Sequence, residues 1–389
     1  MKMRVYLDNN STTPIDPRVK QAIEPYLGEI FGNPSNLHYY GRESAEGIAR
    51  AREQVAAFLN AKPEEIFFTS GGTEANNWAI KGVAVAQMLT RGRHIITSPI
   101  EHASVLGSTK YLADTAWQVT YLPVDSYGLI DPADVKKAIT GATALVSVML
   151  ANNEIGTIEP VKEIAEICHE QGVLCHTDAV SAAGKIKIDV EELGVDLLTI
   201  SGHKIHAPKG VGVLYIRSGT PIHPLIHGGH HEKGLRAGTE NVVGIVGMGS
   251  ACAILKEEWQ QNAEKVRKLR DRLEQGILAL IPDVRLNGHP QKRLPNTSHF
   301  SIAYVEGEAL LMNLDLEGIA VASGSACSSG EPEPSPTVKA IGVPELYRNS
   351  VVRFSLGEEN TEEEIDYTLN VLEQVVKRLR AISPLTKKD

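Results

Sequence analysis

Short apolar runs alternate with amphipathic stretches along residues 50–220. Seven runs are rich in Val, Ile and Leu: EIFFTS, HIITSP, QVTYLPV, ALVSVML, VLCHTD, LLTIS and VGVLYI. Continuous apolar strands that alternate with helices are typical of a mainly parallel sheet with helices on both faces. The pattern therefore predicts an α/β fold built on a mainly parallel seven-stranded sheet.

The pattern changes near residue 245. Residues 242–281 read as one long helical stretch, apolar at its start and amphipathic with many charges afterwards. The segments NTSHFSIAYV, GIAVASGSAC and VVRFSLG follow, and TEEEIDYTLNVLEQVVKRLRAI is a final predicted helix. We predict a large domain over residues 15–255 and a smaller α+β domain over residues 256–389, with residues 1–14 packed beside the smaller one.

Composition limits the partners that this chain can have. The 389 residues are 42% apolar and 22% charged, as in ordinary globular proteins, and the net charge of −9 comes without a basic block. This argues against nucleic acid and anionic membranes as partners. The N-terminal residues lack the apolar core of a signal peptide, and no uncharged apolar run of about 18 residues follows. The four cysteines show no CxxC spacing, which favours a reducing compartment, the cytoplasm, over a disulfide or zinc framework.

Ligands of open α/β sheets bind beyond the carboxyl ends of the strands, so the residues that follow each run matter most. After FFTS, the turn Gly71-Gly72-Thr73 leads into a helix, whose first N–H groups and positive dipole end suit a phosphate. The turn lacks the GxxxxGK[ST] and GxGxxG patterns, so it does not specify a nucleotide. A plain glycine turn with Thr73 as the N-cap stays open as the alternative.

Polar residues also follow four further runs. They are Glu101 and His102, Asn152 and Asn153, Asp178, and the segment Ser201, Gly202, His203 and Lys204. Each has an ordinary structural explanation: a loop histidine, an asparagine turn, a paired carboxylate or a solvated lysine. Together they would place an anion cradle, an imidazole, an amide, a carboxylate and an amine on one edge of the sheet. That set suits pyridoxal 5′-phosphate (PLP), which needs a phosphate site, a lysine for a Schiff base, a carboxylate for its ring nitrogen and a stacking partner.

Nine motifs extend this picture over most of the chain. YLDNN, FGNPS, FTSGGTEANN, EHASV, NNEIGTI, SGHKIHAPKGVG, GLRAGTENV, GSACSS and VRFSLG run in this order from residue 6 to about residue 357. With them the chain resembles the class I cysteine desulfurases, PLP-dependent enzymes of fold type I that supply sulfur for iron–sulfur cluster assembly. The resemblance implies a fold-type I transferase that converts L-cysteine to L-alanine and holds the sulfur as an enzyme persulfide.

The resemblance also implies roles for the residues around the cofactor ring. Lys204 would form the Schiff base, and Asp178 would pair with the ring nitrogen. His102 would stack on the ring and carry protons together with Lys204. Asn153 would contact the ring, and Ser181 stands where the family has a glutamine that binds the ring hydroxyl.

The phosphate and the substrate would have their own residues. Four residues would hold the phosphate: Gly72, Thr73, Ser201 and His203. Thr239 would reach the phosphate in the neighbouring subunit, which implies a homodimer. Arg353 and Asn33 would bind the substrate, and the guanidinium fork of Arg353 matches a carboxylate.

Sequence context separates Cys327 from the other cysteines. Cys168 lies in a predicted helix, Cys175 in a predicted strand and Cys252 in the apolar start of the long helix, so all three are predicted in the core. Cys327 stands in ASGSACSSGEPEPSPTV, where small residues and prolines leave little to bury it. Its thiolate would attack the sulfur of L-cysteine and later pass it to an iron–sulfur scaffold or another acceptor protein.

Three places depart from the family pattern. Ser181 replaces the usual glutamine and is too short for the same contact, which puts cofactor affinity in question. Ser11 replaces the usual alanine. The loop after Cys327 is richer in proline than is usual, which puts its reach in question.

Other functions stay open at this point. A selenocysteine lyase, an aminotransferase or a kynureninase-like hydrolase of the same fold would share everything except Cys327. A non-catalytic descendant would have lost Lys204, Asp178 or Cys327, and all three are present. The segment HPLIHGGHHEKG offers a metal-binding alternative, but its glycine-rich context gives no regular scaffold, and no metal site is predicted. Its histidines are His223, His227, His230 and His231.

Overall fold

The computed structural model describes residues 3–323 and 334–384. Within them the largest sheet has seven strands in the order β2-β8-β7-β6-β5-β3-β4. The strands are β2 (Ile66–Thr69), β3 (His94–Thr97), β4 (Gln118–Tyr121), β5 (Thr143–Ser147), β6 (Leu174–Asp178), β7 (Leu197–Ser201) and β8 (Gly212–Ile216). β8 is antiparallel to both of its neighbours, and the remaining adjacent pairs are parallel. Each predicted run forms one strand, and the predicted α/β fold is confirmed.

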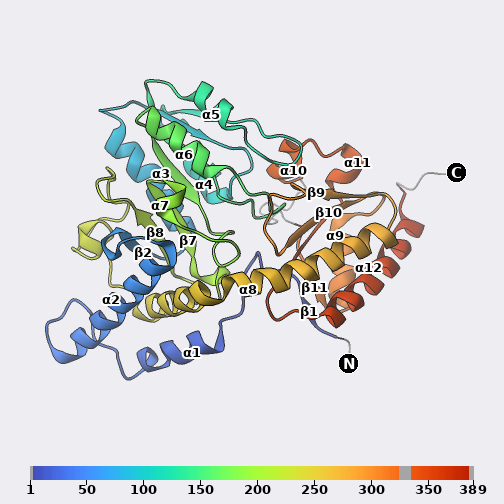
Figure 1. The fold of residues 1–389 in the computed structure, drawn as a ribbon, viewed down its shortest axis with the longest axis horizontal. Coiled ribbons are helices and arrows are strands. Elements are labelled where there is room, and N and C mark those ends of the chain that lie inside the picture. Colours follow the sequence, from blue (N-terminus) through green and yellow to red (C-terminus); the bar gives the residue numbers. More distant parts are fainter. Residues whose placement is uncertain (1–2, 324–333, 385–389) are drawn as a thin grey trace.

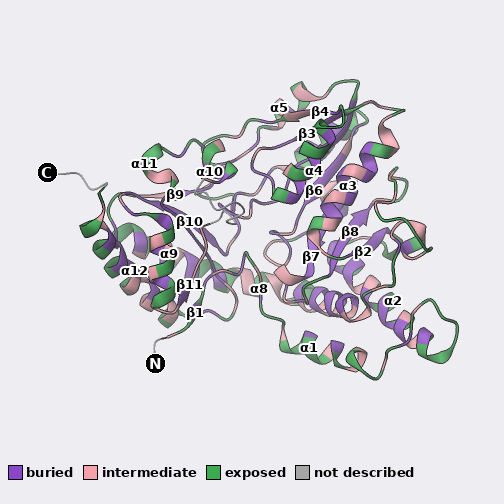
Figure 2. Ribbon diagram, turned by 180° about the vertical axis from the view of Figure 1, so that it is seen from behind, coloured by how far each residue is buried: buried purple, intermediate pink, exposed green. Residues whose placement is uncertain are grey.

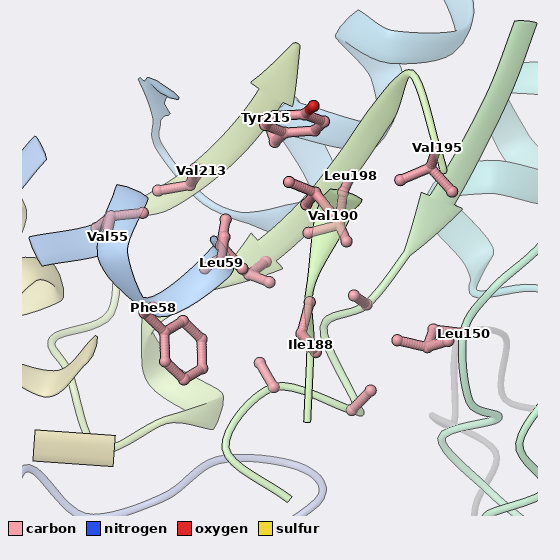
Figure 3. Packing of buried hydrophobic residues seen from close by; sticks show 14 of the residues in the cluster. Val55, Phe58, Leu59, Leu150, Ile188, Val190, Val195, Leu198, Val213 and Tyr215 are labelled. Atoms are coloured by element: carbon pink, nitrogen blue, oxygen red, sulfur yellow. The ribbon is translucent and has the colours of Figure 1, made fainter. Parts of the chain in front are cut away.

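Helices cover both faces of this sheet (Figure 1). The helices of this part of the chain are α1 (Pro17–Ile23), which packs on the long helix α8 (Val242–Leu280), α2 (Tyr39–Leu59), α3 (Gly72–Gln87), α4 (Ala103–Ala113), α5 (Pro132–Ala138), α6 (Val161–Glu170) and α7 (Val190–Leu193), with the short 3₁₀ helices η1 (Glu24–Leu27), η2 (Pro63–Glu65), η3 (Gly202–Lys204) and η4 (Glu232–Gly234). Successive strand residues point to opposite faces, and so Leu197 and Leu198 of β7 belong to different hydrophobic clusters. Leu197 shares its cluster with Trp78 of α3, and Leu198 shares its cluster with Leu59 of α2 (Figure 3).

Burial explains why these runs are apolar throughout. β2, β3, β5, β6, β7 and β8 are buried or nearly so along their whole length, whereas β4, at the end of the sheet, is half exposed (Figure 2). A strand covered on both faces has no solvent side and shows no alternation.

One helix of 39 residues, α8 (Val242–Leu280), runs from the large sheet to a second core. Its first half lies so close to α2 that a Cβ on Gly249 would come within 2.5 Å of Ala51 Cα. Its second half contributes Leu269 and Leu273 to the second core. The predicted long helix is confirmed. No helix within the described residues combines the length and the apolar composition needed to cross a membrane.

The second core lies between α8 and a smaller sheet of order β12-β10-β9. Its elements are β1 (Val5–Tyr6), β9 (Val284–Asn287), β10 (Thr297–Ile302), β11 (Ile319–Ala320) and β12 (Val351–Ser355), with α9 (Gly307–Leu316), α10 (Pro336–Ala340), α11 (Glu345–Arg348) and α12 (Glu362–Ile382). Val5 pairs with Ile319, so the N-terminal segment lies against this part of the chain. β9 was not among the predicted strands.

Candidate active site

A cavity of about 790 Å³ lies beyond the carboxyl ends of β6 and β7, beside the start of α3. Ten of the predicted site residues line it: Gly72, Thr73, His102, Asn153, Asp178, Ser181, Ser201, His203, Lys204 and Arg353. They come from six separate segments of sequence, and the parallel strands bring most of them to one edge of the sheet. Their chemical roles stay predictions.

The turn between β2 and α3 forms one end of the cavity. Gly71 is the N-cap of α3 and has φ +154°, a conformation that side chains rarely adopt. A Cβ on Gly72 would lie 2.9 Å from Val180 Cγ2, so the backbone approaches the β6 side closely. The first N–H groups of a helix have no intrahelical partner, and those of Gly72 and Thr73 border the cavity. Thr73 is the second residue of the helix, so the alternative that made it the N-cap is wrong.

Lys204 ends η3, directly after β7, and its Nζ donates a hydrogen bond to the carbonyl of Asn10. Burial lowers the pKa of Lys204 to about 8; the charge of Arg353 acts in the same direction, and Asp8 and Asp178 oppose it. Roughly a tenth of the amine is therefore neutral at pH 7. Burial also lowers the pKa of the neighbouring His203 to about 4, with a contribution from Lys204, so that imidazole is neutral.

Asp178 is the last residue of β6 and only 4% exposed. Its Oδ2 accepts a hydrogen bond from Asn76 Nδ2 at 2.6 Å, and its Oδ1 accepts one from the N–H of Val180 at 2.9 Å. These are the hydrogen-bonding partners that the sequence led us to expect. A carboxylate offers about four acceptor sites, so Asp178 keeps capacity for a further donor in the cavity.

His102 is the N-cap of α4. Its Nδ1 accepts a hydrogen bond from the N–H of Ser104 at 3.2 Å and lies 2.7 Å from Ser104 Oγ. Within the described residues, His102 Nε2 has no hydrogen-bond partner. Beneath it, Glu101 accepts hydrogen bonds from Ser98 Oγ and the N–H of Met149, and burial raises the pKa of Glu101 to about 8.

Arg353 enters the cavity from β12, in the smaller sheet. Its Nη2 donates to Asp8 Oδ1 at 2.7 Å and to Ser11 Oγ at 2.8 Å, and its Nη1 donates to the carbonyl of Asn153 at 3.1 Å. Arg353 as a whole is 4% exposed, and its Nε is buried without a partner among the described residues. The site therefore contains a buried cation with donor capacity left over.

Two of the remaining predicted site residues are not in the cavity lining. Thr239 and Asn33 are exposed on loops, and Asn33 Oδ1 accepts the N–H of Ser35 at 3.0 Å. Cys327 lies outside the described residues. Cys168, Cys175 and Cys252 are buried free thiols, as predicted. The described part of the chain contains no group of three or more His, Cys, Asp or Glu side chains arranged to hold a metal.

The residues around the cavity fit PLP in their donor chemistry. The start of α3, with Thr73, Ser201 and His203, supplies donors for a dianionic phosphate. Asp178 supplies a buried acceptor for a protonated ring nitrogen, and Lys204 supplies an amine of lowered pKa for the aldehyde.

Comparison with known proteins identifies the family. The model of the aminotransferase class-V family matches residues 5–368. Cysteine desulfurase IscS of Dictyoglomus turgidum is 53% identical over 384 residues, which cover 99% of this chain and 97% of the relative. The chain belongs to the cysteine desulfurase family. Cysteine desulfurase IscS of Methanosarcina thermophila is 49% identical, with 99% of this desulfurase and 95% of the relative covered.

Solved structures agree with this membership. A structure described as a NifS-like protein is 42% identical to this desulfurase and has a TM-score of 0.91, covering 97% of this chain and 100% of the other. The structure of SspA in complex with cysteine is 33% identical with a TM-score of 0.81, covering 93% and 100%. The predicted resemblance and the fold-type I architecture are confirmed.

The two serines that depart from the family pattern both border the cavity of this desulfurase. Ser181 follows Asp178 by three residues and makes no side-chain hydrogen bond within the described chain. Ser11 does more than the sequence indicated, because its Oγ donates to Asp8 Oδ1 at 2.8 Å while it accepts from Arg353.

Sequence reasoning missed several residues of the lining. They are Asn10, Thr12, Asn76, Met149 and Lys209. Asn76 lies in the quoted motif FTSGGTEANN and is buried, whereas the second asparagine of the motif, Asn77, is only half-buried and donates back to the carbonyl of Thr73. No local pattern distinguishes the two asparagines; a helical count from the phosphate turn would have placed Asn76 on the sheet side.

Proposed function

We propose that this desulfurase binds PLP and removes sulfur from L-cysteine, leaving L-alanine and a persulfide on Cys327. One observation carries the proposal: Lys204, Asp178 and Arg353 line the same cavity, as an amine of lowered pKa, a buried carboxylate and a buried guanidinium. The related SspA, solved in complex with cysteine, supports the substrate. The sequence motif GSACSS supports Cys327.

Bound PLP supplies an electron sink next to the substrate's α-carbon. Asp178 holds the proton on the ring nitrogen, because a nearby carboxylate favours the charged form. The N–H groups of Gly72 and Thr73 hold the phosphate, together with Ser201 and His203. Asn153 and Ser181, which line the same cavity, would contact the ring.

Lys204 and Arg353 act on the substrate. The guanidinium of Arg353 binds the carboxylate of L-cysteine, which fixes the direction of the bonds at the α-carbon. The amine of Lys204 takes up the α-proton, and its lowered pKa keeps it available as a base near neutral pH. His102, which lines the same cavity, would serve as the stacking partner of the ring.

Cys327 takes the sulfur as a thiolate. An S–S bond forms between Cys327 Sγ and the substrate sulfur while the substrate's Cβ–S bond breaks. The electron pair of the broken bond stays with the carbon fragment, which is protonated and leaves as L-alanine. The sulfur then passes to an iron–sulfur scaffold or another acceptor protein.

We also propose a homodimer in which Thr239 serves the phosphate of the other subunit. The segment from η1 to the start of α2 supports this, because it exposes a group of large apolar side chains that a partner would cover. They are Leu27, Phe31, Leu37, Tyr39 and Tyr40. Asn33 lies within this segment, and its contact with substrate stays a prediction.

The same proposal includes two domains, over residues 15–255 and over residues 256–389 with 1–14. Two separate hydrophobic clusters, one at the first half of α8 and one at its second half, support this division. The buried free thiols Cys168 and Cys175 support a reducing, cytoplasmic location.

The test uses purified protein with L-cysteine and a thiol reductant, and measures L-alanine and sulfide. We expect equal rates for the two products in the wild type and loss of both in Cys327→Ala and Lys204→Ala. A Cys327→Ala variant that keeps its activity would exclude Cys327 as the acceptor and favour a lyase. A wild type that binds PLP but makes no L-alanine would overturn the proposal that L-cysteine is the substrate.

A further inference from the structure

The side chains assigned to the ring nitrogen and to the ring face of the cofactor, Asp178 and His102, are joined by a continuous chain of hydrogen bonds. Asn76, on α3, donates from Nδ2 to Asp178 Oδ2 at 2.6 Å and from the same Nδ2 to Ser104 Oγ at 2.9 Å. Ser104, on α4, lies 2.7 Å from His102 Nδ1. Asp178 ends β6 and His102 is the N-cap of α4, and Asn76 and Ser104 connect them from α3 and α4.

The direction of every bond in this chain is fixed by its ends. The carboxylate of Asp178 can only accept, so the side-chain amide of Asn76 must turn its NH₂ group toward it. The NH₂ group has two hydrogens, and the second one meets Ser104 Oγ. At the other end, the backbone N–H of Ser104 can only donate, so His102 Nδ1 must accept at 3.2 Å. The hydroxyl of Ser104 therefore accepts from Asn76 and donates to His102.

Asn76 gives a second indication that its donors matter. It is 1% exposed, and its Oδ1 is buried without a hydrogen-bond partner within the described residues. Turning the amide over would place this oxygen against the carboxylate of Asp178. The protein thus leaves one buried acceptor unsatisfied and uses both N–H groups of Asn76 in the hydrogen bonds to Asp178 and Ser104.

The consequence for His102 is a single tautomer. Nδ1 accepts from both the N–H and the hydroxyl of Ser104, so a neutral imidazole carries its hydrogen on Nε2. A neutral imidazole of this kind offers the cavity a donor and no lone pair. It cannot take a proton from the substrate at Nε2.

We propose that Asn76 and Ser104 are positioning residues that hold His102 as its Nε2–H tautomer, so that His102 faces the cavity as a hydrogen-bond donor and the base for the α-proton is Lys204. This rests on the proposed function, because it divides between two residues the proton transfers of that reaction. The cofactor's nitrogen partner and its stacking partner are then oriented by one network, and a change in either linking side chain reaches both.

Long-range ¹H–¹⁵N spectra of the holoenzyme with ¹⁵N-labelled histidine test this directly, because protonated and unprotonated ring nitrogens have widely separated shifts. The chain has 13 histidines, and the signals of His102 are those missing in His102→Gln. We expect hydrogen on Nε2 in the wild type. A wild type with hydrogen on Nδ1 would overturn the proposal.

Variants separate the positioning role from a structural one. Ser104→Ala removes the hydroxyl and should turn the His102 signals into those of a tautomer mixture, with a roughly tenfold fall in kcat and little change in KM. Ser104→Thr keeps a hydroxyl and should restore both the wild-type His102 signals and the wild-type kcat. Ser108→Ala is the matched control. Ser108 lies one turn along the same helix, its Oγ donates to the carbonyl of Ser104 at 2.7 Å, and it is not part of the hydrogen-bond network between Asp178 and His102.

Asn76→Leu and Asn77→Leu make a second matched pair, because Asn77 is half-buried and its side chain donates to the carbonyl of Thr73; only Asn76→Leu should shift the His102 signals. Signals that stay in place in both Ser104→Ala and Asn76→Leu would refute the positioning role. The spectra do not depend on turnover. A fixed Nε2–H tautomer in a protein that leaves L-cysteine unchanged would therefore refute the proposed function and not the network.

Discussion

Ser11→Ala should tighten substrate binding although it removes a hydrogen bond from the site. A guanidinium pairs with a carboxylate through one of two forks, Nε with Nη2 or Nη1 with Nη2, and both use a hydrogen of Nη2. In Arg353 both Nη2 hydrogens are taken, one by Asp8 and one by Ser11, while the buried Nε has no partner in the described chain. A substrate carboxylate must therefore displace one of the two acceptors to form a fork.

Ser11 is the acceptor that is easier to displace. Asp8 forms an ion pair with the buried Arg353, and breaking such a pair typically costs about 3–5 kcal/mol. A hydrogen bond to a charged group contributes about 1.5–3 kcal/mol, and Ser11 is exposed and keeps its bond to Asp8 after displacement. Displacing Ser11 from Arg353 should therefore weaken the binding free energy of the substrate by about 1 kcal/mol, which is about fivefold in affinity.

The assay compares wild type and Ser11→Ala by the KM for L-cysteine and by the Kd of L-alanine, read from the cofactor absorbance. Both constants should fall about fivefold in the variant with kcat nearly unchanged, because the change affects substrate and transition state alike. Binding of 2-aminoethanethiol, which lacks the carboxylate, should not change and serves as the control. A KM that is unchanged or higher would refute the reasoning, since Ser11 would then not compete with the substrate.

Three further predictions follow from the same cavity. In protein freed of cofactor, Lys204→Met should raise the free energy of unfolding in urea at pH 7 by about 2 kcal/mol. Removing a buried charge whose pKa is about 8 instead of 10.5 contributes about 3 kcal/mol, and losing the hydrogen bond to the carbonyl of Asn10 takes away about 1 kcal/mol. The unfolded chain binds more protons between pH 8 and 10.5, so wild-type stability rises with pH there and the gain should fade across this window; a constant gain would contradict the charge argument. The pH midpoint for chemical labelling of Lys204 in the same cofactor-free protein should rise when L-alanine is added, and an unchanged midpoint would show that Arg353 and Lys204 are not coupled. Gly212→Ala should weaken PLP binding at least tenfold in a fluorescence titration, because its Cβ would come within 2.5 Å of the backbone of Gly71; Gly107→Ala, with open space around it, should not.

The sequence predicted those features that depend on a single helix or strand, or on the direction of the parallel strands. Each apolar run became one strand because a strand covered on both faces must be apolar throughout. Asp178 and Lys204 could be assigned to one edge because parallel strands point their carboxyl ends the same way. β9 was missed because Val284–Asn287 is short and half exposed, so its four residues carry no clear apolar signal.

Contacts between elements could not be predicted in this way. Asn76 and Ser104 meet because α3 and α4 pack together; a helical count could place Asn76 on the buried side of α3, but it does not tell which residue of α4 Asn76 meets. Ser11 was noticed only as a departure from the family. Its importance depends on Arg353, which is 342 residues away in the sequence and reaches the cavity from the other sheet.

The two cations of the cavity act on each other as well as on the substrate. Burial is the main cause that lowers the pKa of Lys204 to about 8, and the charge of Arg353 is the next. A carboxylate bound to Arg353 adds a negative charge that offsets this repulsion, so the free amine of Lys204 binds a proton more firmly once the substrate is in place. A base that gains proton affinity when its substrate arrives is suited to take the α-proton from it. In the proposed mechanism, Arg353, buried and anchored by Asp8, therefore serves the proton transfer as well as the orientation of the substrate.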